Sequence, residues 1–249
     1  MKKLLLIIAV CCITTSVNAQ KRILINTWNK SNIEQYNNLQ KDVMMNRYMF
    51  NGWNTFCVPF DMTEQQIDEV FGSDCRVETM VGATGTSTAV NVYFDDVKSK
   101  GIEANKPYLI YYTGESKYLN IRLSDVTIKA EGMRELTFNT ADGTAVTLKG
   151  ADDHFDGLGS YGILAADNGS VNFVPVTPNL NGIYPTRCSL NVMGSNSAKV
   201  VAHHGEPSGI EALKEDILKI NAKYNINGMK VKDGAKGIII ENGKKHVSK

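Results

Sequence analysis

The stretch that decides the fold is Gly52-Trp53-Asn54-Thr55-Phe56-Cys57-Val58-Pro59-Phe60-Asp61, an aromatic and β-branched run that ends at a proline. Such residues favour a β-strand, and Pro59 ends it because proline has no amide hydrogen to donate. The preceding Asn51-Gly52 pair is typical of a tight turn, so we expect a hairpin that pairs Val43–Phe50 with Trp53–Val58. We predict that this hairpin organises the core.

A short helix is predicted directly after this strand. Thr63 and Gln66 have the spacing of a capping box, and Met62 and Ile67 that of the hydrophobic contact that fixes a helix start. Gly72 is typical of a helix end, because glycine readily adopts a positive φ. The apolar stripe of the helix consists of Ile67, Val70 and Phe71. We expect the helix to cover one end of the sheets.

The rest of the chain reads as short strands separated by turns. The strands that we expect lie at 22–25, 76–81, 90–94, 106–112, 118–123, 126–130, 135–139, 145–148, 161–165, 170–174, 182–184, 189–192 and 198–202, with 82–88 as a flexible connection. The run 106–112 is almost entirely strand-forming, which indicates burial on both faces. This spacing predicts an all-β protein: a β-sandwich or partly open barrel with one short helix, plus a small C-terminal β meander.

The first 19 residues have the parts of a secretory signal peptide. Lys2-Lys3 precedes an apolar run over residues 4–13, and small residues lead up to Ala19. We expect cleavage after Ala19; a lipid anchor at Cys11 is the alternative, although Val10 rather than a small residue precedes it. No later segment is apolar and long enough for a transmembrane helix, so none is expected after cleavage.

Four parts follow from these signals. Residues 1–19 are the signal peptide, 20–204 a β-sandwich-like module that two sub-sheets could make up, 205–213 a linker, and 214–249 a small β domain. The linker contains Gly205, Pro207 and Gly209, which favour irregular structure. Beyond it, Asn-Gly and Asp-Gly turns separate expected strands at 217–224, 229–231, 237–240 and 244–247.

Charge and cysteine content exclude several classes of protein. The 27 Lys and Arg residues balance 26 Asp and Glu, and loss of Lys2 and Lys3 leaves a mature net charge near −1, which gives no footprint for nucleic acid. Three cysteines remain, an odd number that excludes a complete disulfide framework. One Cys57–Cys75 bridge across the helix is one interpretation, and three buried free thiols, with Cys188 as the third, is the other.

Two polar clusters and one cysteine are candidates for chemistry. Asp152-Asp153-His154-Phe155-Asp156-Gly157 has features of a calcium loop, but the closing glutamate of such a loop would fall at Ile163, so we favour a solvated turn. His203-His204 has no further Cys or His at ligand spacing and reads as an exposed domain edge. Cys57 lies in mid-strand, which indicates a buried, inert thiol rather than a nucleophile. No catalytic set, metal site or cofactor is expected.

Exposed aromatic side chains are the remaining candidates for a binding site, because a ring pairs an apolar face with a polar group. The residues that we single out are Trp28, Tyr111 and Tyr112, from a set that also contains Tyr108, Tyr118 and Tyr161. Trp28 is the best candidate for exposure, because its neighbours are polar. Alternate positions of a buried strand point inward, so most of the tyrosines are expected in the core.

Several segments between about Tyr36 and Ala202 follow one another in a specific order. They are Val43–Phe50, Trp53-Asn54-Thr55 with Val58-Pro59-Phe60, Phe71-Gly72, Ile102–Ile110, Phe155-Asp156-Gly157 and Tyr161-Gly162. In this order they resemble a recurrent β-rich module of secreted Bacteroidetes proteins. That family has no established activity, so the resemblance implies a secreted β-rich fold and no particular chemistry.

The C-terminal residues Gly209–Lys249 carry a second pattern. Its motif residues are Tyr224, Asn227, Gly228, Val231, Gly237, Lys244 and Lys245. The pattern is similar to the C-terminal sorting domains of type IX secretion, although Ile238 stands where an aromatic residue is usual. The resemblance implies recognition by outer-membrane secretion machinery, and a location on the outer-membrane surface or outside the cell.

Together these signals predict a secreted or cell-surface, non-enzymatic β module with a binding or structural role. Its expected ligand is a surface polysaccharide or a protein, and neither a cofactor nor nucleic acid is expected. Glycan binding through exposed aromatic residues is one alternative. A hydrolase that uses Cys57 or the Asp152–Asp156 cluster is another.

The expected cleavage and export can be tested together. Fractionation of the native host, with mass spectrometry of the termini, is expected to find a chain that begins at Gln20 outside the cytoplasm, because the leader is removed during export. The same spectra show whether Gly209–Lys249 remains attached. A cytoplasmic chain that retains residues 1–19 would contradict export.

Overall fold

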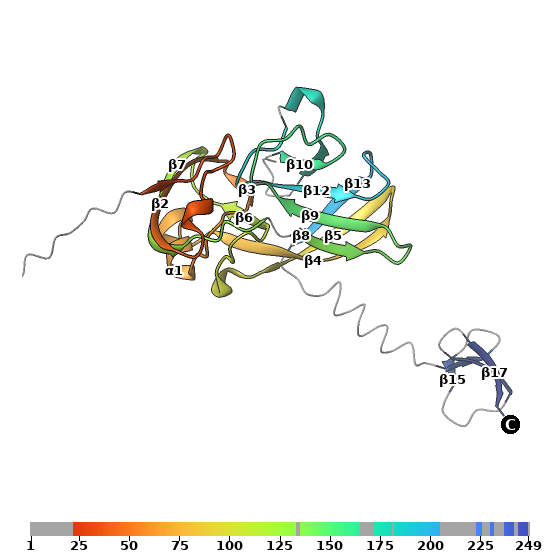
Figure 1. The fold of residues 1–249 in the computed structure, drawn as a ribbon. Coiled ribbons are helices and arrows are strands. Elements are labelled where there is room, and N and C mark those ends of the chain that lie inside the picture. Colours follow the sequence, from red (N-terminus) through yellow and green to blue (C-terminus); the bar gives the residue numbers. More distant parts are fainter. Residues whose placement is uncertain are drawn as a thin grey trace, which may run out of the picture.

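The computed structural model describes residues 22–132, 135–164, 172–180 and 182–204, and four further strands between residues 223 and 248. These residues are mostly β-strand (Figure 1), and α1 (Glu64–Phe71) is the only α-helix among them. The expected all-β fold with one short helix is therefore confirmed. Within the same residues, no helix has the length and apolar character that crossing a bilayer requires.

The described part of residues 22–204 forms three sheets. The first has the order β1-β2-β7 and contains β1 (Ile23–Leu24), β2 (Gln40–Met49) and β7 (Lys117–Thr127). The second has the order β13-β5-β4-β6-β3 and contains β13 (Lys199–His204), β5 (Ala89–Asp96), β4 (Arg76–Thr86), β6 (Tyr108–Tyr112) and β3 (Gly52–Phe56). The third has the order β11-β10-β12-β9-β8 and contains β11 (Asn172–Pro175), β10 (Tyr161–Leu164), β12 (Cys188–Val192), β9 (Ala145–Gly150) and β8 (Glu135–Asn139). Short 3-10 turns lie at η1 (Glu34–Tyr36), η2 (Lys98–Lys100) and η3 (Pro178–Leu180).

The C-terminal strands form an antiparallel sheet of their own. Its order is β15-β14-β16-β17, with β14 (Lys223–Asn225), β15 (Lys230–Val231), β16 (Gly237–Glu241) and β17 (Lys244–Ser248). The small C-terminal β unit is therefore present. Because β14 lies between β15 and β16, however, the order is not that of a strict meander. The start of the expected strand 217–224 and the linker 205–213 lie outside the described residues.

β3 and β6 form the wall between two hydrophobic cores. The two strands are paired antiparallel along their whole length. In β6, Tyr108 and Ile110 belong to one core and Leu109 to the other, because successive side chains point to opposite faces. The expectation that residues 106–112 contain a strand buried on both faces is confirmed.

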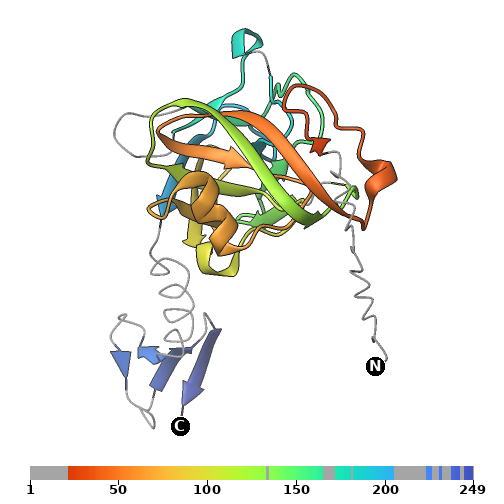
Figure 2. The same cartoon turned by 90° about the vertical axis from the view of Figure 1, so that its left-hand side faces the viewer.

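One core lies between the first sheet, α1 and one face of β3 and β6. Figure 2 shows β2 and β7 as a long curled ribbon in front of the rest of the module. The members of this core include Val43, Met45 and Met49 of β2, Ile121 and Leu123 of β7, Ile67 and Phe71 of α1, and Phe56, Tyr108, Ile110 and Tyr112 of the shared wall. The curled ribbon therefore closes one half of the module like part of a barrel.

The other core lies between the second and third sheets, which face each other as a β-sandwich (Figure 1). From the second sheet it takes Trp53, Met80, Val90, Val92, Phe94 and Leu109, and from the third Val146, Leu148, Tyr161, Phe173, Leu190 and Val192. The module thus combines a sandwich with a curled half-barrel, and β3 and β6 serve both.

The start and end of α1 are those that the sequence predicts. The Thr63 N–H donates to Gln66 Oε1 at 2.9 Å, and the Gln66 N–H donates to Thr63 Oγ1 at 3.2 Å, which completes the capping box. Gly72 has a φ of 92° and its N–H donates to the Asp68 carbonyl at 2.9 Å. Ile67 is buried beneath the helix. The capping, the end and the buried stripe are therefore confirmed.

The Asn51-Gly52 turn does not join a hairpin. β2 pairs with β7 while β3 pairs with β6, so the expected pairing of Val43–Phe50 with Trp53–Val58 is wrong. The Asn54 side chain accepts the Phe50 N–H at 2.9 Å and donates to the Phe50 carbonyl at 2.9 Å. The Asn54 side chain therefore binds the N–H and C=O of Phe50, which a hairpin would pair with the next strand. The turn becomes a corner between two sheets.

One expected loop and one expected break between strands lie within strands of the structure. β4 runs through most of the expected connection 82–88 with a bulge between Met80 and Gly82, so that loop is wrong. A Cβ at Gly85 would lie 2.1 Å from the Ala89 carbonyl oxygen, so the glycine permits a tight approach to β5 rather than flexibility. β7 likewise joins the two strands expected at 118–123 and 126–130, with Asp125 at a φ of 54°.

The corner at Asn54 is expected to contribute measurably to stability. Asn54→Ala removes the partner of the Phe50 N–H and of two carbonyls, so the free energy of unfolding should fall by about 2 kcal/mol, as measured by denaturant titration. Asn46→Ala, an exposed position on β2, is the matched control and should change it by less than about 0.5 kcal/mol. Equal, small effects of both substitutions would contradict this role of Asn54.

Candidate ligand-binding site

A small hollow lies beside the part of β2 that extends beyond its pairing with β1. It encloses about 80 Å³ and is lined by aromatic rings and two guanidinium groups. We call the following six residues the aromatic hollow: Trp28, Arg47, Tyr48, Tyr118, Tyr184 and Arg187. They come from four separate segments of the chain, so only the tertiary fold brings them together.

The rings of the aromatic hollow contact one another in pairs. Tyr48 and Tyr118 are directly opposite in the β2–β7 ladder, and their ring centroids lie 5.1 Å apart, edge to face. Trp28 and Tyr184 are packed in the same way at 5.1 Å. The backbone N–H of Trp28 donates to Asn26 Oδ1 at 2.8 Å, which fixes the local turn. Trp28 remains 57% exposed and Tyr118 54%, so ring faces are open to a ligand.

Arg47 is a charged residue on the buried face of β2, and only 1% of it is exposed. Its guanidinium donates to the carbonyl oxygens of Thr55 and Thr186 and, at 2.7 Å, to the Thr186 hydroxyl, while its Nε has no partner among the described residues. Burial lowers the pKa of Arg47 well below its ordinary value, and the charge of Arg187 lowers it further. The three oxygens that accept hydrogen bonds from this guanidinium are two carbonyls and one hydroxyl, so all of its partners are neutral.

Arg187 follows Thr186 directly and is half-buried. Among the described residues, its guanidinium makes no hydrogen bond and no ion pair. Burial lowers the pKa of Arg187, and the nearby Tyr184 and Tyr118 partly oppose this shift. The ionisable groups that influence the pKa of Arg187 are thus two tyrosines of the aromatic hollow, and no carboxylate is among them. The aromatic hollow therefore holds a positive charge that the described chain does not neutralise.

A larger groove of about 510 Å³ lies between α1 and β7, and three of its five charged lining residues, Asp61, Glu103 and Lys129, are paired within the fold. Asp61 accepts the Ala104 N–H at 2.7 Å and forms an ion pair with Lys129 at 3.0 Å. Glu103 pairs with Lys106 at 2.8 Å. Most of these charges are satisfied and no aromatic ring lines the groove, so the aromatic hollow is the stronger candidate.

The cluster Asp152–Asp156 supports the aromatic hollow rather than forming a site of its own. Asp153 Oδ1 accepts the Lys30 N–H at 2.9 Å and the His154 N–H at 2.7 Å. The His154 ring lies 4.5 Å from the Tyr184 ring. These contacts fasten the Trp28 loop and Tyr184 to each other, so the cluster acts as a brace beside the hollow.

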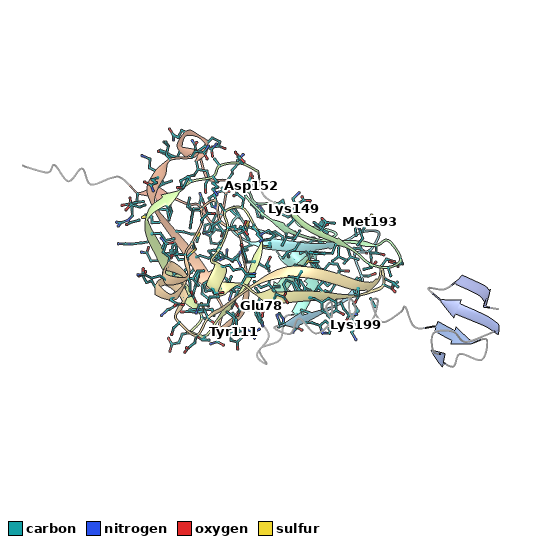
Figure 3. The ribbon with its side chains drawn as sticks, turned by 90° about the horizontal axis from the view of Figure 1, so that it is seen from below. Glu78, Tyr111, Lys149, Asp152, Met193 and Lys199 are labelled. Atoms are coloured by element: carbon teal, nitrogen blue, oxygen red, sulfur yellow. The ribbon has the colours of Figure 1, made fainter. Side chains whose placement is uncertain are left out.

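Of the three aromatic residues singled out from the sequence, only Trp28 lies at the aromatic hollow. Tyr112 is 5% exposed and belongs to a core, and Tyr111 packs edge-on against Trp53 at a centroid distance of 5.2 Å. Figure 3 shows Tyr111 and Asp152 on opposite edges of the module. The expectation that Tyr111 and Tyr112 share an exposed platform with Trp28 is therefore wrong, because β6 is buried on both faces.

Tyr118 belongs to the wider aromatic set noted in the sequence, but the other four residues of the hollow were not singled out there. Tyr48, Tyr184 and Arg187 stand in ordinary strand or turn contexts. Arg47 gives one signal, because it takes the inward place of a Val43, Met45, Arg47, Met49 alternation. A charge at a core position of a strand predicts a special role, since buried charges are costly.

All three cysteines of the module are free and buried. Cys57 and Cys75 belong to different cores, so the Cys57–Cys75 bridge is wrong. Burial raises the pKa of the Cys57 thiol well above its ordinary value, and Cys188 raises it further. A thiol that stays protonated is a poor nucleophile, so the hydrolase hypothesis has no support at Cys57.

His203-His204 is not a simple exposed edge. His204 stacks on Trp53 at a centroid distance of 4.2 Å, and its Nδ1 lies 2.5 Å from Oε2 of the fully buried Glu78. Figure 3 places Glu78 on the same side as Tyr111. Arg76 also pairs with Glu78, so this carboxylate is neutralised inside the fold. The sequence-based expectation of exposure is thus wrong for His204.

The residues of the sorting-like pattern are placed only as backbone. Tyr224 lies in β14, Val231 in β15, Gly237 at the start of β16, and Lys244 and Lys245 in β17. Asn227 and Gly228 lie outside the described residues.

Comparison with known proteins gives no match: neither family models, nor curated proteins, nor solved structures match this chain. What the aromatic hollow binds must therefore follow from its own geometry.

The buried thiols are expected to be inert in the folded protein. Iodoacetamide at pH 8.5 should label Cys57, Cys75 and Cys188 only after unfolding, as measured by mass spectrometry, because thiolates react and buried thiols stay protonated.

Burial raises the pKa of Cys188 from an ordinary 9.0 to about 12. The stability that this thiol contributes is therefore complete below pH 9 and is lost as the pH rises toward 12. Rapid labelling of the native protein would contradict this burial.

Proposed function

We propose that this protein is a secreted or cell-surface binding module that recognises carbohydrate rings in its aromatic hollow. The observation that carries the proposal is the pair of exposed rings, Trp28 and Tyr118, in the lining of a hollow that also contains hydrogen-bond donors. Ligand sites are typically concave and mostly apolar, with a few polar groups that fix orientation. The aromatic hollow has this composition.

Carbohydrate fits these walls for a chemical reason. One face of a pyranose presents C–H groups that pack on an aromatic ring, while its hydroxyls need hydrogen-bond partners. Tyr48, Tyr118 and Tyr184 each add a hydroxyl to an apolar ring, so they can serve both needs. Exposed aromatic patches on a monomer commonly mark binding surfaces. The small volume, about 80 Å³, suits one ring or substituent of a longer chain rather than a whole oligosaccharide.

Export is part of the same proposal. The leader at residues 1–19 and the similarity of Gly209–Lys249 to type IX sorting domains support a route through the outer membrane. The secretion machinery would then be a partner of the C-terminal sheet, and a surface polysaccharide or protein the ligand of the module. The Bacteroidetes-like motif order of residues 36–202 supports the same compartment.

Glycan binding is tested by an array followed by titration of the best binder. Trp28→Ala and Tyr118→Ala are each expected to weaken binding about tenfold, because each removes about 1 kcal/mol of ring packing together with the polar group of that residue. Met193→Ala is the matched control, since Met193 is 60% exposed and is not among the hollow residues. An array without any binder would refute carbohydrate recognition, and an architectural role would then remain as the hypothesis.

A further inference from the structure

The two arginines line the same hollow and lie close enough to interact; Arg47 is fully buried and Arg187 is half-buried. The charge of Arg187 acts on Arg47, and the other ionisable groups that act on either of them are Cys57, Cys188, Tyr118 and Tyr184. No carboxylate is among these groups. A buried cation and a half-buried one side by side repel each other, which is costly unless an anion offsets the charge.

Arg47 is accommodated by the fold itself. Its guanidinium binds two carbonyl oxygens and one hydroxyl, and it packs 5.2 Å from the Phe56 ring. These contacts use three of the five N–H donors of a guanidinium, and they join β2 to β3 and to Thr186. Arg47 therefore acts as a positive structural group behind the hollow, and its charge adds to that of Arg187.

Arg187 has no such partners in the described chain, yet its position is tightly held. Thr186 has a φ of 65°, an unusual conformation for a β-branched residue. It is kept there because its carbonyl accepts both the Cys57 N–H, at 3.0 Å, and the Arg47 guanidinium, while its own N–H donates to the Ala151 carbonyl at 3.0 Å. These hydrogen bonds hold Thr186 in an unusual backbone conformation, and this fixes the position of the Arg187 backbone that follows it.

Asp153, an acidic residue of the brace beside the hollow, is already occupied. Asp153 binds the N–H groups of Lys30 and His154 and is not among the lining residues. The Arg187 fork is therefore a set of donors at the wall of an aromatic hollow, with a second cation behind it and no carboxylate of the described chain against it.

We propose that the aromatic hollow recognises a sugar acid: a carbohydrate unit whose carboxylate binds Arg187 while its ring packs against the aromatic walls. This inference rests on the proposed function and names its ligand class. A planar carboxylate matches the planar guanidinium fork with two parallel hydrogen bonds. The bound carboxylate also offsets the repulsion between Arg187 and Arg47, so binding gains from a charge arrangement that the free protein keeps at a cost.

The test compares ligands that differ only in charge, with the full mature chain. Calorimetric titration is run with an oligogalacturonate, with the same oligosaccharide methyl-esterified on its carboxylates, with a sialylated oligosaccharide and its asialo form, and with a sulfated neutral oligosaccharide. At least one carboxylate form is expected to bind tenfold or more tightly than its uncharged counterpart, and this ratio should fall as salt is added. The uncharged counterparts probe the rings alone.

Variants then locate the effect. Arg187→Gln is expected to bring the ratio of charged to uncharged affinity close to one while the uncharged ligand still binds, and Arg187→Lys should restore only part of it, because lysine keeps the charge without the fork. Arg122→Gln, an exposed arginine on β7, is the matched control and should leave the ratio unchanged. The methyl ester removes the charge without touching the protein, so the test stands even if an Arg187 variant does not fold.

The outcomes separate the two proposals. If neither charged nor uncharged sugars bind, carbohydrate recognition itself fails. If both forms of each pair bind equally, the sugar-acid inference fails while carbohydrate recognition stands. Stronger binding of the sulfated sugar than of any carboxylate, or an unchanged ratio in Arg187→Gln, also overturns the inference.

Discussion

β3 and β6 have no face that meets solvent, and the rest of the module depends on that constraint. One face of this two-stranded wall packs against the third sheet and the other against α1 and the curled β2–β7 ribbon. A strand buried on both faces must find apolar partners on both sides, so both cores have to form around it. The short helix and the ribbon exist in this arrangement because they cover the face that the sandwich leaves open.

Where the two halves meet, the chain uses polar side chains rather than a regular ladder. Asn54 satisfies the backbone of Phe50 at the corner, and Arg47 reaches from β2 to carbonyls of Thr55 and Thr186. Regular pairing cannot continue through such a seam, because the strands diverge into different sheets. The aromatic hollow lies at this same seam, so the device that closes the fold also places a buried charge beside exposed rings.

Local signals in the sequence were sufficient for local structure. The capping box at Thr63 and Gln66, the end at Gly72 and most strand positions depend on neighbours in the chain, and the structure confirms them. The Asn51-Gly52 hairpin was wrong because turn chemistry says where a chain turns but not which strands then pair. Pairing was decided by residues about fifty to ninety positions away, through the contacts of β2 with β7 and β3 with β6.

The sequence by itself determined the class of fold, the helix and the double-sided burial of β6, because periodicity and capping are properties of adjacent residues. Tertiary structure alone decided that Gly52–Phe56 pairs with β6, that Cys57 and Cys75 lie in separate cores, and that Trp28 shares one hollow with Tyr118 and Arg187. The physical reason is that a site assembled from distant segments has no local period. The residues of the aromatic hollow come together only because the sheets pack around the β3–β6 pair.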